Sequence, residues 1–130
     1  CWGYENRTAA VRIPGGPSSQ RRIEHRVAGA DTNAYLVMAA ILGAALTGIE
    51  GEMQPPKAIK SSAYDGDNAH MPTLPLSWQD SLDALMAGKM LNDFIPGILR
   101  DMLVKTKQQE MRRFNEMVTP FEYQSYLDQV

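Results

Sequence analysis

Arginine and glutamate side chains alternate along a short segment near the start of the chain. Arg22, Glu24 and Arg26 are two residues apart, and side chains of an extended strand alternate between faces, so these three would share one face. A glutamate carboxylate suits Mg²⁺ or Mn²⁺, and arginine forks bind phosphate or carboxylate groups. Arg7 and Arg12 add two more cations from the preceding segment. These residue types therefore suit a metal ion held beside anionic groups, as in a phosphoryl-transfer site.

A salt-bridged surface strand is the alternative explanation of the same residues. Exposed ion pairs are common on protein surfaces and stabilise little. The spacing alone favours this alternative.

The full string around these residues resembles the C-terminal part of the catalytic domain of the glutamine synthetase family. Residues 6–14 match the family pattern Asn-Arg-x-Ala-x-x-Arg-Ile-Pro, and residues 21–26 match Arg-Arg-Ile-Glu-x-Arg. Residues 33–36 match the Asn-x-Tyr-Leu that opens a helix. The resemblance continues to the last residues, so it covers essentially the whole chain.

The resemblance implies an ATP-dependent ligase that joins glutamate to ammonia or an amine through γ-glutamyl phosphate. By position, Glu24 matches a ligand of the Mg²⁺ or Mn²⁺ that bridges the ATP phosphates. Arg7 and Arg12 match arginines on the transferring phosphoryl group and ATP, and Arg7 also lies near the substrate glutamate. Arg22 matches an arginine on the nucleotide phosphates. Arg26 matches the arginine that holds glutamate and its acyl phosphate.

Two positions depart from the family pattern. Ser19 stands where many bacterial members carry an ATP-binding lysine. Tyr64 aligns with a tyrosine that some members adenylylate, but residues 62–67 differ from the usual Asn-Leu-Tyr-Asp-Leu-Pro. We therefore expect Tyr64 to be an ordinary loop tyrosine.

Neither histidine fits a metal site. His25 would point away from Glu24 on the strand, and His70 lies in a proline-rich loop without a partner at ligand spacing.

Composition excludes several other classes of protein. The chain has 130 residues, 44% apolar and 22% charged, with a formal charge of −2. That balance argues against nucleic-acid binding. The single cysteine, Cys1, cannot form an internal disulfide, which favours a cytoplasmic location. The apolar segment 34–49 is short and rich in small residues, so we expect no membrane span.

We expect an α+β fold. Residues 7–13 and 21–28 are predicted to form two strands that pair as antiparallel neighbours, and the resemblance places them in a larger antiparallel catalytic barrel. A mostly helical C-terminal region follows. Helices are predicted over 34–49, 78–87, from Pro96 to about Met117, and from Thr119–Pro120 to Leu127, with 51–76 irregular. The first helix is apolar all round and is predicted to be buried, and the methionines are predicted to lie in the core.

The resemblance also implies what surrounds the chain. Residues 1–130 would be the C-terminal portion of a catalytic domain, without the N-terminal β-grasp domain and the rest of the catalytic domain. Family members form ringed homo-oligomers, dodecamers among them, with active sites shared between subunits. The segments 2–7 and 118–122 look closer to γ-glutamylputrescine synthetase and related γ-glutamylamide synthetases than to the ammonia enzyme. The nitrogen donor stays open, and a catalytically inactive fragment that serves as an oligomer-forming module is the alternative.

Overall fold

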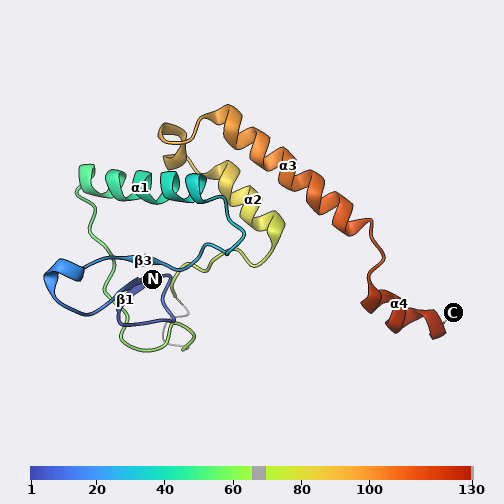
Figure 1. Cartoon of the computed structure of the whole chain (residues 1–130), viewed down its shortest axis with the longest axis horizontal. Helices are drawn as coiled ribbons and strands as arrows, with labels where there is room; N and C mark the ends of the chain where they lie inside the picture. The colour runs from blue at the N-terminus through green and yellow to red at the C-terminus, as the bar shows by residue number, and fades with distance from the viewer. Residues whose placement is uncertain (66–69, 130) are drawn as a thin grey trace. The chain divides into compact units, whose positions relative to one another are not determined.

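The computed structural model describes residues 1–65 and 70–129 and divides into two compact units (Figure 1). The first unit is Cys1–Leu74, and the second starts at Pro75. Strands lie in the first unit and most helices in the second, so the α+β class predicted from the sequence is confirmed.

Three short strands make the sheet of the first unit, in the order β1-β2-β3. They are β1 (Trp2–Tyr4), β2 (Val11–Ile13) and β3 (Glu24–His25). β2 and β3 pair antiparallel, as predicted, whereas β1 pairs parallel to β2 and was not predicted. Both predicted strands are shorter in the structure than 7–13 and 21–28.

A local turn explains why the strand starts at Val11. The Asn6 Oδ1 accepts hydrogen bonds from the Thr8 backbone N–H at 3.0 Å and from the Thr8 hydroxyl at 2.6 Å. Asparagine favours such turns, in which its side chain replaces a backbone partner. The backbone N–H of Ala9 also donates to the carbonyl of Asn6 at 3.4 Å. These bonds hold residues 6–9 out of the extended conformation.

β1 lies against the segment 56–63, and this contact requires a glycine. The Ile59 N–H donates to the Trp2 carbonyl at 2.9 Å, and the Trp2 indole N–H donates to the Pro56 carbonyl at 2.7 Å. A Cβ at Gly3 would come within 2.8 Å of the Ile59 carbonyl oxygen. Ile59 and Ala9 are buried in this unit.

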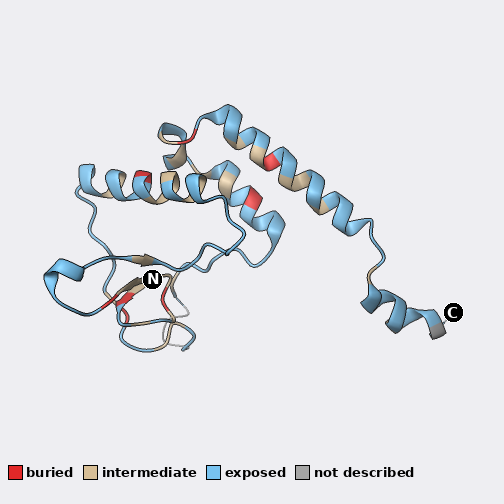
Figure 2. Cartoon of the chain, in the orientation of Figure 1, coloured by how far each residue is buried: buried red, intermediate tan, exposed pale blue. Residues whose placement is uncertain are grey.

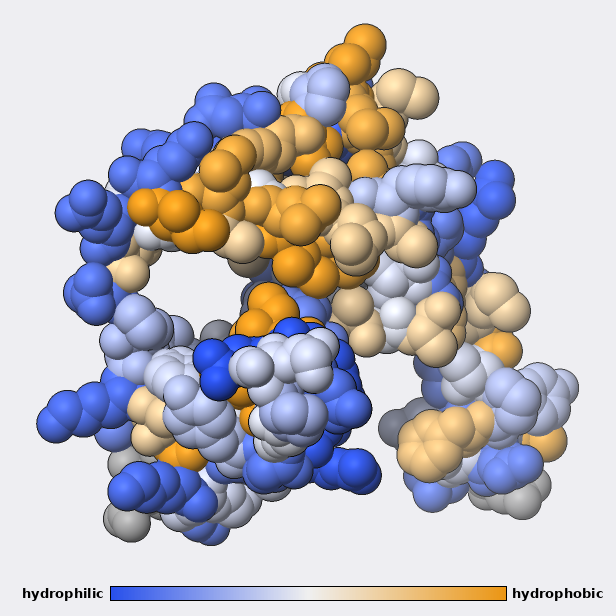
Figure 3. All heavy atoms as spheres, turned by 60° about the vertical axis from the view of Figure 1, so that its left-hand side comes forward, coloured by the Kyte–Doolittle hydropathy of each residue, from blue (hydrophilic) through white to orange (hydrophobic). Residues whose placement is uncertain are grey.

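The helix α1 (Ala34–Glu50) has the predicted cap but not the predicted burial. The Asn33 Oδ1 accepts from the N–H groups of Tyr35 and Leu36. Just over half of the helix residues are exposed, however (Figure 2). Tyr35 reaches 88% exposure. Hydrophobic residues, coloured orange, accordingly lie at the molecular surface in Figure 3. Three strands of two or three residues offer too little surface to cover a helix of 17 residues.

Between the two helical regions, residues 51–65 and 70–76 contain neither helix nor strand, as predicted. Gly66, part of the same predicted loop, lies outside the described residues.

The second unit contains α2 (Trp78–Ala87), η3 (Met90–Asp93), α3 (Gly97–Asn115), α4 (Pro120–Tyr126) and η4 (Leu127–Gln129). α2 packs against α3, and Leu82, Ile95 and Val104 form a small core. Ser77 and Thr119 cap α2 and α4, as predicted. Among the described residues, no helix is long and apolar enough to cross a bilayer.

The prediction that the methionines lie in the core is wrong, because six of the eight are exposed and the other two, Met71 and Met111, are half-buried. Met102 is 60% exposed and Met117 is 65% exposed. Met102 is two residues before the buried Val104, which places it on nearly the opposite side of the helix. α3 packs against α2, and Val104 is its buried residue.

Candidate functional site

The antiparallel register of β2 and β3 places Arg12 directly opposite Glu24. The Arg12 Nη1 donates to the Glu24 Oε2 at 2.8 Å, and the Arg22 Nη2 donates to the Glu24 Oε1 at 3.2 Å. One carboxylate therefore lies between two guanidiniums, with one of its oxygens on each. The expectation that Arg22 and Glu24 share a face agrees with this contact.

Glu5 is a second acidic residue of the site, and it was not predicted. The Arg12 Nη2 donates to the Glu5 Oε2 at 2.8 Å, and the Glu5 Oε1 accepts from the Gly15 backbone N–H. Glu5 directly follows β1, so its place beside Arg12 depends on the parallel pairing of β1 and β2. No local sequence pattern reports that pairing.

Contacts within this network shift the pKa values of its members. The hydrogen bond from Arg12 is the main cause that lowers the pKa of Glu24, and Arg22 adds to the effect. The Gly15 N–H, followed by Arg12, lowers the pKa of Glu5. Glu24, followed by Glu5, raises the pKa of Arg12. Both carboxylates therefore remain ionised at neutral pH, as ligands of a cation must.

Arg26 and the turn that holds Arg7 meet beside the start of β2. The Arg26 Nη1 donates to the backbone carbonyl of Arg7, and the Arg26 N–H donates to the Ala10 carbonyl at 2.9 Å. Arg7 lies in the turn 6–9, and both arginine side chains are exposed. The Arg26 side chain thus contacts the turn 6–9, which contains Arg7. The Arg22 side chain contacts Glu24 instead.

Glu24 fits as one ligand of a metal ion but not as a complete site. Each carboxylate oxygen has a second lone pair beyond the one used by arginine, so Glu24 retains acceptor capacity. Mg²⁺ and Mn²⁺ need several oxygen ligands. Within residues 1–65 and 70–129, no group of three or more His, Cys, Asp or Glu side chains could hold a metal.

The remaining residues singled out from the sequence lie apart from the charged network. His25 is exposed opposite Val11 in the ladder, and His70 lies in the irregular segment. Ser19 lies in η1 (Ser18–Gln20), on the exposed connection between β2 and β3. Tyr64 is 87% exposed in a turn, which agrees with an ordinary loop tyrosine.

The family pattern around Tyr64 is only partly visible, because Gly66 and Asp67 lie outside the described residues.

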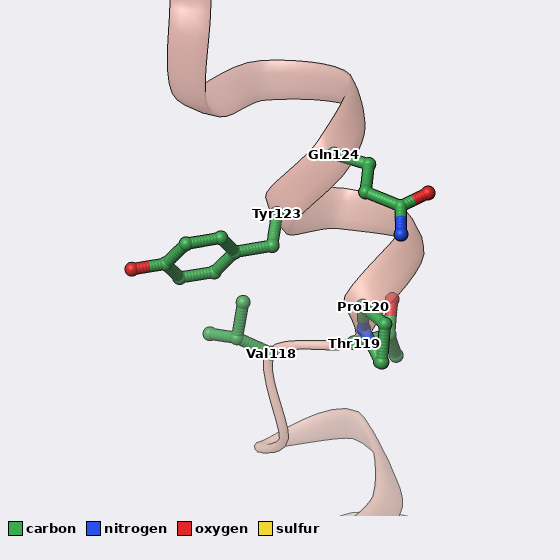
Figure 4. A pocket seen from close by; sticks show the side chains of 5 residues that line it. All are labelled: Val118, Thr119, Pro120, Tyr123 and Gln124. Atoms are coloured by element: carbon green, nitrogen blue, oxygen red, sulfur yellow. The ribbon is translucent and has the colours of Figure 1, made fainter.

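A shallow hollow at the end of the second unit contains none of the predicted site residues. Figure 4 shows the side chains that line it, and Tyr123 and Val118 point toward the same side. The other lining residues are Thr119, Pro120 and Gln124. Because no charged side chain lines it, this hollow has no obvious role with phosphate or glutamate.

Comparison with known proteins identifies the family. The protein-family model described as "Glutamine synthetase, catalytic domain" matches residues 1–126 of this chain. The chain belongs to the glutamine synthetase family. Its strand–turn–strand segment, with Arg12 opposite Glu24, is thus a family segment, and the resemblance noted in the sequence is confirmed.

Individual relatives agree with this assignment. The chain is 32% identical to γ-glutamylputrescine synthetase PuuA of Escherichia coli (strain K12), covering 93% of the chain and 25% of the relative. It is 32% identical to glutamate–isopropylamine ligase of a Pseudomonas species, covering 98% of the chain and 28% of the relative. The chain therefore spans about a quarter of the length of these curated relatives.

A solved structure is similar as well. The structure titled "Apo GmaS without ligand" superposes with a TM-score of 0.81 at 32% identity, covering 97% of this chain and 29% of that one. The fold described above is therefore that of a glutamine synthetase-like protein. The relatives named here are glutamate ligases or synthetases.

Proposed function

We propose that this chain is the C-terminal portion of a longer ATP-dependent ligase that joins glutamate to ammonia or to an amine. The family match across residues 1–126 is the observation that carries the proposal. The charged network of the first unit supports it, because it gathers cations and carboxylates as a phosphoryl-transfer site requires.

The proposed reaction has two steps. First, an oxygen of the glutamate γ-carboxylate attacks the γ-phosphorus of ATP, and the bond from that phosphorus to the bridging oxygen breaks to release ADP. The product is γ-glutamyl phosphate. Second, the nitrogen of ammonia or of the amine attacks the acyl carbon, phosphate leaves, and the nitrogen loses a proton. Each step brings anions together, so the protein must supply positive charge.

The arginines of this chain would supply part of that charge. Arg12 and Arg22 would bind the nucleotide phosphates. Arg7 would contact the transferring phosphoryl group and the substrate glutamate, and Arg26 would hold glutamate and its acyl phosphate. The bond from Arg26 to the Arg7 carbonyl supports a joint glutamate subsite, because it ties the two arginines together.

Glu24 would supply one metal ligand from this chain. Bound Mg²⁺ or Mn²⁺ would neutralise phosphate charge in the first step. The other ligands would come from residues outside this chain, because the described residues hold no cluster of three candidates.

We also propose that the three strands belong to a larger, mainly antiparallel barrel. The antiparallel pairing of β2 and β3 supports this, and the parallel β1–β2 pair would then be a local exception.

A ringed homo-oligomer, a dodecamer by analogy with the family, would cover the apolar helix surface. Exposed side chains such as Leu42, Ile49 and Phe121 support such an assembly, since water-exposed apolar area of this kind marks interfaces. A cytoplasmic location remains our proposal for the whole protein.

The nitrogen donor is proposed to be an amine, with ammonia as the alternative. The support is that two relatives are named for putrescine and isopropylamine.

A second candidate is an inactive module that only builds the oligomer. The absence of a metal-binding cluster from the described residues favours it for this chain in isolation.

The test uses the full-length protein and, as its control, the 130-residue chain alone. Each is incubated with ATP, Mg²⁺ and glutamate, and with ammonia, putrescine or isopropylamine in turn. Mass spectrometry then follows the γ-glutamyl product. We expect product from the full-length protein with at least one donor and none from the isolated chain. Absence of product with every donor would refute the ligase proposal, and turnover by the isolated chain would refute the need for outside metal ligands.

A further inference from the structure

Glu5 joins three parts of the first unit through one side chain. Its backbone directly follows β1, where its N–H donates to the Ile13 carbonyl at 3.0 Å. One carboxylate oxygen accepts from Arg12 on β2, and the other accepts from the Gly15 N–H, where the connection to β3 begins. The side chain therefore links the orientation of Arg12 to the position of the connecting loop.

The backbone of Glu5 adopts a conformation that favours other residue types. Its φ is 51°, in the left-handed region. Glycine populates that region freely, and asparagine and aspartate enter it more readily than longer side chains do. A glutamate here carries a conformational cost. Such a cost at a position with two specific side-chain contacts points to a need for this carboxylate.

Arg12 is held at both ends of its guanidinium. Its side chain is 12% exposed, and its two Nη atoms each donate to a different carboxylate, Glu24 and Glu5, at 2.8 Å. Because the guanidinium is planar and rigid, two such bonds fix both its position and its plane. Each Nη has a second N–H, and in the proposed function those two groups would bind an anion.

We propose that Glu5 is a positioning residue that fixes the Arg12 guanidinium for the nucleotide phosphates and couples it to the loop that starts at Gly15. This inference rests on the proposed function, in which Arg12 binds phosphate. Glu5 itself touches no substrate in this proposal. Its effect on catalysis passes entirely through Arg12 and the loop.

Glutamine at position 5 separates the two contacts of Glu5. In Glu5→Gln, the amide oxygen can still accept from the Gly15 N–H, but the charge that holds Arg12 is gone. Glu50→Gln is the matched control, because Glu50 is an exposed glutamate at the end of α1 and outside the network. Both variants are made in the full-length enzyme and checked by thermal unfolding.

The main measurement is calorimetric binding of Mg²⁺ with a non-hydrolysable ATP analogue, which does not depend on turnover. We expect the Kd of Glu5→Gln to rise about tenfold, in the range found when a residue that orients a ligand group is removed. Glu50→Gln should match the wild type. An unchanged Kd in Glu5→Gln would overturn the proposal, whichever reaction the enzyme catalyses. Failure of the wild type to form any γ-glutamyl product would instead refute the proposed function alone.

A double variant tests whether Glu5 acts through Arg12. Arg12→Lys lacks the planar fork, so adding Glu5→Gln to it should weaken nucleotide binding by less than about twofold further. In steady-state kinetics, Glu5→Gln should raise the KM for ATP and leave the KM for glutamate unchanged. Independent, multiplicative losses in the double variant would overturn the positioning role, and so would an equal rise in both KM values.

A shorter acid covers the case in which Glu5→Gln does not fold. Glu5→Asp keeps the charge but shortens the reach by one methylene, so it should also raise the Kd for the analogue. Wild-type affinity in that variant would equally overturn the proposal.

Discussion

Replacing Glu24 with glutamine should abolish most activity of the full-length enzyme. Its carboxylate accepts one guanidinium on each oxygen, at 2.8 Å from Arg12 and 3.2 Å from Arg22. The glutamine side chain has one acceptor oxygen and one amide NH₂ donor, so at least one arginine would face a donor in place of an acceptor. The proposed metal would also lose an anionic ligand.

The size of the effect follows from these two losses together. Removing a group that only supports metal ligands typically costs about 10- to 100-fold in affinity or activity. Glu24 is proposed to bind the metal directly and also orders two arginines, so kcat/KM for ATP should fall by more than about a hundredfold. The Mg²⁺ concentration for half-maximal activity should rise as well.

His25→Ala is the matched control on the same two-residue strand. His25 is exposed and follows Glu24 directly, so its side chain points to the opposite face. We expect its kcat/KM to stay within about twofold of the wild type. Equal losses in the two variants would show that the strand geometry does not separate these side chains. An unchanged Mg²⁺ requirement in Glu24→Gln would refute its role at the metal.

Three further outcomes are expected. Arg26→Lys should raise the KM for glutamate and lower kcat, costing roughly ten- to a hundredfold in kcat/KM because lysine lacks the bidentate fork; loss of ATP-analogue binding with an unchanged glutamate KM would contradict this. Deletion of residues 119–130 should lower the oligomer order in size-exclusion experiments, because several exposed apolar side chains are removed; an unchanged assembly would exclude a role for this tail. The lowered pKa values of Glu5 and Glu24 mean that their stabilisation is complete above the ordinary value of 4.5 and is lost as pH falls through the folded values. The melting temperature of the double variant Glu5→Gln/Glu24→Gln should therefore fall less steeply below that pH than that of the wild type, and parallel pH profiles would contradict the assignment.

Helix starts could be predicted from the sequence because their causes are local. Asn33, Ser77 and Thr119 each accept a hydrogen bond from a backbone N–H two or three residues ahead. Such capping depends only on three or four consecutive residues. The predicted helix starts consequently agree with the structure to within about one residue.

The pairing of β1 could not be predicted, because parallel strands usually need a connection of a dozen or more residues. β1 is only three residues long, and its parallel partner β2 begins seven residues after it ends. The Glu5–Arg12 contact depends on that pairing, so no sequence pattern around Glu5 predicted the contact. Arg12 and Glu24, by contrast, belong to a predicted antiparallel pair, although the register that places Arg12 opposite Glu24 was not predicted.

Burial was the least predictable property. The apolar pattern of α1 indicates which residues should avoid water but not which partner covers them. Tyr35 and Ile49 are 88% and 75% exposed in this chain. A partner from another segment or subunit is a matter of tertiary or quaternary structure, and hydrophobic periodicity does not encode it.

Isotope transfer tests the central claim, a ligase that acts through γ-glutamyl phosphate, most directly. The full-length enzyme is supplied with glutamate labelled with ¹⁸O in its γ-carboxylate, together with ATP, Mg²⁺ and the accepted amine. If a carboxylate oxygen attacks the γ-phosphorus and later leaves with it, each phosphate released should carry one ¹⁸O and each amide product should retain the other. Unlabelled phosphate, or release of AMP in place of ADP, would contradict the proposed mechanism.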